Sequence, residues 1–203
     1  MPRSLQTSVE TLSPAEAQSA IDVLRLSFAA DPLIRWLFPE SHRYLRWFPE
    51  FVRRYGGRAF QAGTADAVGN NEGVALWLEP TVTPENERVA ELLEAVVPDD
   101  RRPYLWRLAH RLMESTPVEP YWHLVFLGVD PHAQRQGLGS KLLEHGLKRV
   151  DANGDIAYIE TATSENLSMY TNHGFQLIDV VSTEDGPPVY TMARDPGGVN
   201  PHR

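Results

Sequence analysis

The sequence feature that most constrains the fold is a nearly continuous apolar run, YWHLVFLGV, at residues 121–129. A strand with one face in water alternates in polarity, whereas an unbroken apolar run is typical of a strand covered on both faces. The run is also much shorter than the roughly 20 apolar residues that a membrane-spanning helix needs. It therefore predicts a buried strand at the centre of a sheet.

The residues after this strand predict alternating helices and strands. A loop at 130–139 precedes a helix at 140–150, in which leucines recur near one face. The remaining expected elements are a strand at 156–161, a short helix at 164–173 closed by Gly174, and two last strands at 175–182 and 188–194.

The first 120 residues predict a half that is rich in helices. The sequence Ser13-Pro14-Ala15-Glu16 is typical of a helix start, with Ser as the N-cap, Pro in the first turn and Glu three positions after the cap. The other expected elements are a strand at 5–12, a short and a longer helix within 33–62 that Pro49 bends or separates, a strand pair at 65–69 and 73–79, and helices at 84–97 and 101–114.

The composition limits the classes of protein to consider. A chain of 203 residues is long enough for one domain with a full core, which we place at 1–194 with a flexible tail at 195–203. The net charge of -8 argues against a nucleic-acid partner, because phosphate binding depends on Lys and Arg. The absence of cysteine excludes disulfides and an acyl-cysteine intermediate.

Two further expectations concern location and metals. The N-terminus lacks the hydrophobic core of a signal peptide, and no segment is long and apolar enough to span a membrane. We therefore expect a cytoplasmic protein without a membrane partner. The histidines show no convincing ligand spacing, so no metal site is expected.

The loop Gln134-Arg135-Gln136-Gly137-Leu138-Gly139 lies between a predicted strand and a predicted helix. Backbone N–H groups at a helix start have no internal partner, and glycine lets a bulky anion approach them. The spacing fits neither a P-loop nor a dinucleotide fingerprint. The loop therefore predicts a phosphate or pyrophosphate site; the alternative is a tight turn with an exposed Arg135.

Two motifs together resemble the GNAT superfamily of N-acetyltransferases. The first is Val129-Asp130-Pro131-x-x-Gln134-Arg135-x-Gly137-x-Gly139, and the second is Asn166-x-x-x-Tyr170-x-x-x-Gly174-Phe175. The resemblance covers residues 121–194 and extends over the first 120 only in general layout. It is most similar to the puromycin N-acetyltransferase-like branch, through Gly128-Val129, Gly137-Leu138-Gly139-Ser140, Ile159-Glu160-Thr161 and Gly186-Pro187-Pro188.

The resemblance implies a mixed α/β fold with a mostly antiparallel sheet of about seven strands and helices on both faces. Strands 121–129 and 156–161 would be parallel and splayed, with acetyl-CoA as cosubstrate in the gap. Residues 1–120 would form the acceptor-side half and 121–194 the acetyl-CoA-binding half. The family also makes a homodimer an expectation.

The resemblance also assigns cofactor-binding residues, with a bulge of the central strand at Gly128 and the Val129 N–H as oxyanion donor. Tyr170 would be the general acid that protonates the sulfur of CoA. The full cofactor-binding set is Leu127, Gly128, Val129, Gln134, Arg135, Gln136, Gly137, Leu138, Gly139, Ser140, Asn166 and Tyr170.

The general base has two candidates, His123 and Glu160. Alternation along a strand places His123 on one face with Val125, Leu127 and Val129. A protonated amine has a pKa near 10.4, so it must lose a proton before it attacks, and a histidine is a sensible acceptor of that proton. Glu160 on the neighbouring strand is the rival.

The expected reaction is transfer of an acetyl group to a primary amine of a small molecule by direct attack in a ternary complex. Transfer of another acyl group, acetylation of a protein or peptide, and a non-catalytic CoA-binding sensor domain remain alternatives. The sequence does not name the acceptor, because a fold and a cofactor loop carry over between relatives more safely than a substrate does.

Overall fold

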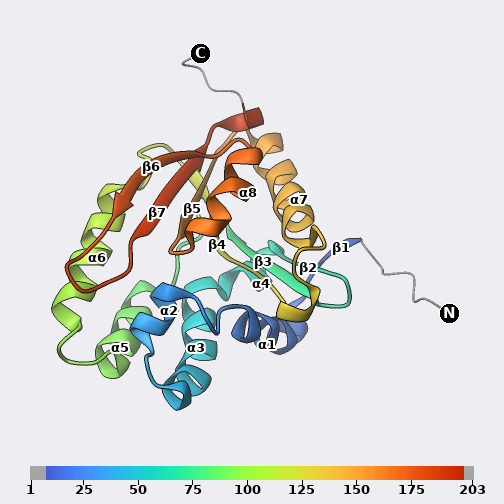
Figure 1. Cartoon of the computed structure of the whole chain (residues 1–203). Helices are drawn as coiled ribbons and strands as arrows, with labels where there is room; N and C mark the ends of the chain where they lie inside the picture. Colours follow the sequence, from blue (N-terminus) through green and yellow to red (C-terminus); the bar gives the residue numbers. More distant parts are fainter. Residues whose placement is uncertain (1–7, 199–203) are drawn as a thin grey trace.

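The computed structural model describes residues 8–198, in which seven strands form one sheet with the order β1-β2-β3-β4-β5-β7-β6 (Figure 1). Neighbouring strands are antiparallel except β4 and β5, which are parallel. The strands are β1 (Val9–Thr11), β2 (Ala65–Val68), β3 (Gly73–Leu78), β4 (Tyr121–Val129), β5 (Ile156–Thr161), β6 (Gln176–Val181) and β7 (Val189–Arg194). The predicted fold class is confirmed.

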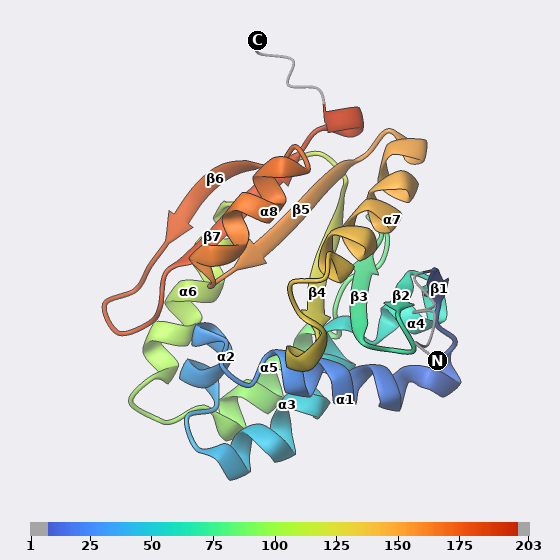
Figure 2. The same ribbon diagram turned by 45° about the vertical axis from the view of Figure 1, so that its right-hand side comes forward.

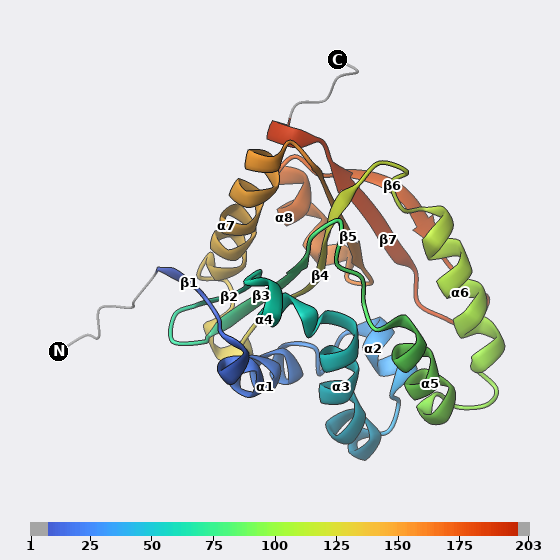
Figure 3. The same cartoon turned by 180° about the vertical axis from the view of Figure 1, so that it is seen from behind.

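Helices cover both faces of this sheet, as Figures 1 and 3 show from opposite sides. One apolar cluster joins helices α1 to α5 to one face, and a second joins α7 and α8 to the other. Helix α6 packs on β6 and β7 at the edge. The helices are α1 (Ala17–Ser27), α2 (Pro32–Leu37), α3 (Ser41–Gly56), α4 (Arg58–Ala62), α5 (Asn86–Val96), α6 (Arg102–Glu114), α7 (Leu138–Asn153) and α8 (Leu167–Asn172).

The central strand β4 has the predicted bounds, but its two faces differ from the prediction. Its register with β3 shifts by one residue between Leu76 and Trp77, which leaves Val125 as the extra residue of a bulge. A one-residue shift moves every later side chain to the other face. His123 therefore shares its face with Val125 but not with Leu127 and Val129, and our prediction for those two was wrong.

We expected this bulge at Gly128, but it lies three residues earlier. Gly128 pairs regularly with Val74 on β3. A Cβ on Gly128 would overlap the Ser27 hydroxyl and lie 2.9 Å from Leu24 Cδ2. The glycine is thus required by the close approach of α1 to the sheet.

The parallel ladder between β4 and β5 is short. It begins with the pairing of Tyr121 to Ile156 and ends with the pairing of Leu124 to Ile159. Beyond this point β4 pairs only with β3, and β5 pairs only with β7. The last residues of both strands therefore diverge, which Figure 2 shows clearly. The predicted splayed strand pair is confirmed.

The structure also bears on the predictions for the Ser13 cap, for Pro49 and for the C-terminal tail. The Ser13 capping box is present, and a 3-10 turn at Pro14–Glu16 leads into α1. Pro49 neither divides the helix nor ends it, because α3 continues through it. In the predicted tail, Pro196–Gly198 form a turn in which the Gly197 N–H donates to Asp151 Oδ1 at 2.8 Å; residues 199–203 and the first three residues of the strand predicted at 5–12 lie outside the described part of the chain.

Helix α7 sits on the sheet through a close contact between Gly146 and Trp77. A Cβ on Gly146 would overlap the edge of the Trp77 indole, whose Cε2 lies 2.5 Å from the Cβ position. Trp77 is fully buried in the cluster between α7 and the sheet. The absence of a side chain at Gly146 therefore sets how closely α7 approaches β3.

We predict that Gly146→Ala lowers the free energy of unfolding by about 1–3 kcal/mol, because overpacking outweighs the gain of about 1 kcal/mol in helix propensity. Chemical denaturation measures this change. Lys148→Ala, at an exposed position of the same helix, is the control and leaves stability within about 0.5 kcal/mol. A Gly146→Ala protein as stable as the wild type would contradict the close contact.

Candidate functional site

The open end of the β4–β5 pair presents backbone donors from β4. The Asp130 N–H donates to Glu72 O at 2.7 Å, on the side of β3. Because backbone groups along a strand alternate in direction, the N–H groups of Val129 and Leu127 point to the opposite side, toward β5. With the ladder ended, these donors have no strand partner. They are suited to bind a carbonyl oxygen that enters the opening.

The loop after β4 leads from this opening to the start of α7. The Gln134 side chain donates to Val129 O at 3.1 Å and ties the loop to the strand end. Arg135 and Gly137 both have positive φ, 62° and 79°. Gly137 has no side chain and has open space around its Cβ position, so an anion can approach the backbone N–H groups beside it.

Helix α7 begins directly after Gly137, and no side chain in the described chain caps its first turn. The first N–H groups of α7 are therefore open to a ligand, and the helix dipole adds positive potential. Gln134, Arg135 and Gln136 are exposed, whereas Leu138 is buried beneath the loop. This geometry suits a pyrophosphate.

Helix α8 lies beside this loop. Met169 Sδ is 3.5 Å from the position of a Cβ on Gly139, so the second sequence motif packs against the first. Tyr170 is buried in the α7–α8 cluster, with its ring 5.7 Å from that of Phe175. Asn166 precedes the helix, is exposed, and makes no capping bond. Burial raises the pKa of Tyr170, and the nearby Asp31 carboxylate raises it further, so the hydroxyl keeps its proton.

Glu160 and His123 lie together on the other face of the sheet, within a group of tyrosines. The Tyr158 hydroxyl donates to Glu160 Oε1 at 3.0 Å, and the Tyr158 ring lies 5.1 Å from that of His123. The rings of Tyr55 and Tyr121 each lie 6.2 Å from His123. The two candidate bases are thus brought into one cluster beside the open end of β5.

The same surroundings shift the two pKa values in opposite senses. Burial raises the pKa of Glu160 to about 7, although the bond from Tyr158 acts against this rise. Burial lowers the pKa of His123 to about 4. A low dielectric disfavours the charged form of both groups, which is the carboxylate for one and the imidazolium for the other. Glu160 is the stronger base of the two.

Sequence analysis did not identify Asp31 as a candidate site residue. Asp31 caps α2 by accepting the Ile34 N–H at 2.9 Å, and it accepts the Thr163 hydroxyl at 3.4 Å. Thr163 follows β5, so this contact joins the α1–α2 turn to the open end of the sheet. The available signal was an acidic residue before Pro32 in the acceptor-side half.

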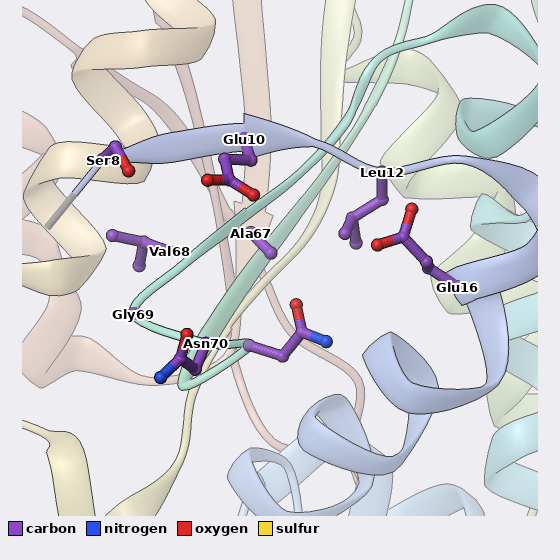
Figure 4. A pocket seen from close by; sticks show the side chains of 9 residues that line it. Ser8, Glu10, Leu12, Glu16, Ala67, Val68, Gly69 and Asn70 are labelled. Carbon is purple, nitrogen blue, oxygen red and sulfur yellow. The ribbon is translucent and has the colours of Figure 1, made fainter. Parts of the chain in front are cut away.

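A small cavity lies elsewhere, between β1 and the turn after β2 (Figure 4). Its volume is about 60 Å³, which admits only a few water molecules. Asn70 and the other residues that line it belong to neither sequence motif, so this cavity is not the predicted cosubstrate site. Within residues 8–198, no helix is both long and apolar enough to cross a membrane, and no three side chains of His, Asp or Glu are placed to hold a metal ion.

Comparison with known proteins finds similar sequences for the part of the chain that holds this site. The family model described as acetyltransferase (GNAT) domain matches residues 105–177. The N-alpha-acetyltransferase RimI of Mycobacterium tuberculosis (strain ATCC 25618 / H37Rv) is 35% identical over 92 residues. That match covers 43% of this chain and 56% of the relative, so it spans little more than half of the relative's length.

Solved structures share the whole fold. A structure described as histone acetyltransferase HPA2 and related acetyltransferase from Corynebacterium glutamicum ATCC 13032 has a TM-score of 0.65 at 24% identity, covering 98% of this chain and 99% of its own. The polyamine N-acetyltransferase of Drosophila melanogaster has a TM-score of 0.64 at 17% identity, covering 93% and 99%. Residues 105–177 of this chain are therefore similar to the acetyltransferase (GNAT) domain, and the chain as a whole shares the fold of these two solved structures.

Proposed function

We propose that this protein is an acetyl-CoA-dependent N-acetyltransferase that moves an acetyl group to a primary amine by direct attack in a ternary complex. The observation that carries the proposal is the open end between β4 and β5. The Leu127 and Val129 N–H groups point into it, and the loop at 134–139 begins where β4 ends. An opening with amide donors at one end and an anion-binding helix start beyond it suits a thioester joined to a pyrophosphate.

In the proposed reaction the pyrophosphate of acetyl-CoA binds at Gln134 to Ser140, and the thioester reaches the β4 donors. The amine nitrogen forms a bond to the thioester carbonyl carbon, and the carbonyl oxygen gains negative charge that the amides of Leu127 and Val129 stabilise. The carbon–sulfur bond then breaks. Tyr170 gives its proton to the sulfur, the base takes a proton from the nitrogen, and both groups exchange protons with solvent afterwards.

Glu160 is the base that we propose, in preference to His123. A base is most effective when its pKa is close to the working pH. The pKa of Glu160 is raised to about 7, whereas that of His123 is lowered to about 4. His123 stays neutral and packs against the ring of Tyr158, whose hydroxyl donates to the Glu160 carboxylate.

The acceptor has two candidate classes. A small-molecule amine is the first, and an α-amino group of a protein or peptide is the second, because the RimI relative is named as an N-alpha-acetyltransferase. The resemblance to the puromycin N-acetyltransferase-like branch, the homodimer and the choice of acetyl over other acyl groups stay predictions. A CoA-binding sensor would need neither a protonated Tyr170 beside the loop nor a buried Glu160, so these residues favour an enzyme.

The proposal is tested by release of free CoA thiol from acetyl-CoA that depends on an added amine, with the acetylated amine identified by mass spectrometry. In this assay we expect Tyr170→Phe to lower kcat by roughly 10²- to 10⁴-fold, the usual contribution of a general acid. The Kd of acetyl-CoA stays close to the wild-type value, because only the hydroxyl is removed. Wild-type kcat in this variant would remove Tyr170 from the mechanism.

The second prediction concerns the pH profile. Since the ionised carboxylate of Glu160 is the active form, kcat/KM rises with pH below about 7, the pKa of Glu160, and levels above it. Glu160→Gln abolishes this limb. His123→Asn keeps it, because a group with a pKa of about 4 does not titrate there.

Two amines of different basicity serve as the control for the profile, since the amine itself also titrates. A limb that follows the pKa of the amine and survives Glu160→Gln would rule out Glu160 as the base.

A further inference from the structure

Asp31 holds a carboxylate without a cationic partner among the described residues. Its two oxygens accept the Ile34 N–H and the Thr163 hydroxyl, at 2.9 and 3.4 Å. The nearest arginines in sequence are engaged elsewhere: Arg25 lies 3.4 Å from Asp22, and Arg35 donates to Pro39 O at 2.6 Å. A partly buried carboxylate without a cation is costly, and buried charges are normally paired.

The position of Asp31 links this carboxylate to the reaction site. Asp31 belongs to the turn between α1 and α2, on the face that α1 to α5 cover, whereas Tyr170 belongs to α8 on the opposite face. The negative charge of Asp31 nevertheless raises the pKa of Tyr170. Thr163 directly follows β5 and contacts Asp31, and this contact places Asp31 beside the open end of the sheet.

A cap alone does not require this charge. One oxygen of Asp31 is enough to accept the Ile34 N–H, and Asn caps helices about as well as Asp. The hydrogen bond from the Thr163 hydroxyl to the second oxygen is long, so this oxygen can still take a stronger donor. Asp31 and Thr163 are both partly exposed, so a ligand can reach them.

We infer that Asp31 binds the ammonium group of the acceptor, and that the substrate class is primary amines that are cationic at neutral pH. This inference rests on the proposed function and adds a binding residue to it. An alkylamine with a pKa near 10.4 is almost wholly protonated at neutral pH, so the abundant form of such a substrate is a cation. Asp31 binds that form beside the open end of β5. Glu160 takes one proton from the ammonium before the attack and passes it to solvent, and it takes the second proton as the amide forms.

The experiment compares two acceptors in the thiol-release assay, a cationic alkylamine and an aromatic amine that is neutral at the assay pH. Asp31→Asn keeps the cap and the shape and removes the charge. We expect its KM for the alkylamine to rise by roughly 10- to 100-fold, the range for a hydrogen bond to a charged group, and its KM for the aromatic amine to stay within about threefold. The Kd of acetyl-CoA and the melting temperature stay close to the wild-type values.

Two control variants keep the result interpretable. Thr163→Val removes the contact to the second oxygen but leaves the charge, so both KM values change by less than about threefold, since one neutral hydrogen bond contributes little. Asp31→Ser supplies a different helix cap without charge, and we expect the same rise in KM for the alkylamine. It takes the place of Asp31→Asn if that variant folds poorly.

An equal change for both amines, or no change for either, would overturn the assignment of Asp31 and leave the proposed function intact. Absence of thiol release with every amine in a wild-type protein that binds acetyl-CoA would contradict the proposed function itself, and the inference would fall with it.

Discussion

The parallel ladder between β4 and β5 ends after four residue pairs, and the proposed chemistry depends on this early end. A continued ladder would occupy the amides of Leu127 and Val129. Because β4 stays paired with β3 and β5 with β7, the two strands diverge without leaving the sheet. The opening is therefore held by the rest of the sheet and does not rely on a mobile loop. Its amides are fixed in direction before any ligand binds, as electrostatic stabilisation of a developing oxyanion requires.

Burial then separates the roles of the groups around this opening. The proposed acid, Tyr170, lies on the α7–α8 face, where a raised pKa keeps its proton in place. The proposed base, Glu160, lies on the opposite face, where a pKa raised to about 7 makes it able to accept a proton near neutral pH. Loss of hydration raises the pKa of both groups. The tyrosine therefore keeps a proton that it can donate, whereas the glutamate becomes basic enough to accept one near neutral pH. His123 shares the surroundings of Glu160, but its pKa moves away from neutrality.

The sequence predicted the sheet well and the fine geometry poorly. The bounds of β4 and β5 were predicted to the residue, because apolar runs and turn residues are local signals. The bulge at Val125 was not predicted, because a bulge depends on the pairing partner and leaves the apolar run unchanged. The bulge was predicted at Gly128, which instead pairs regularly with Val74 and makes room for α1. Asp31 was missed because its neighbour Thr163 is 132 positions away in the sequence.

The most direct test of the account is whether acetyl-CoA binds at the start of α7. Gly137 and Gly154 flank the two ends of this helix, and both have positive φ with open space around the Cβ position. An aspartate therefore brings the same backbone strain and the same charge at either site. Calorimetric titration with acetyl-CoA should show that Gly137→Asp weakens binding by roughly 100-fold or more, through repulsion of the pyrophosphate, while Gly154→Asp binds like the wild type. Equal affinity in the two folded variants would contradict the site.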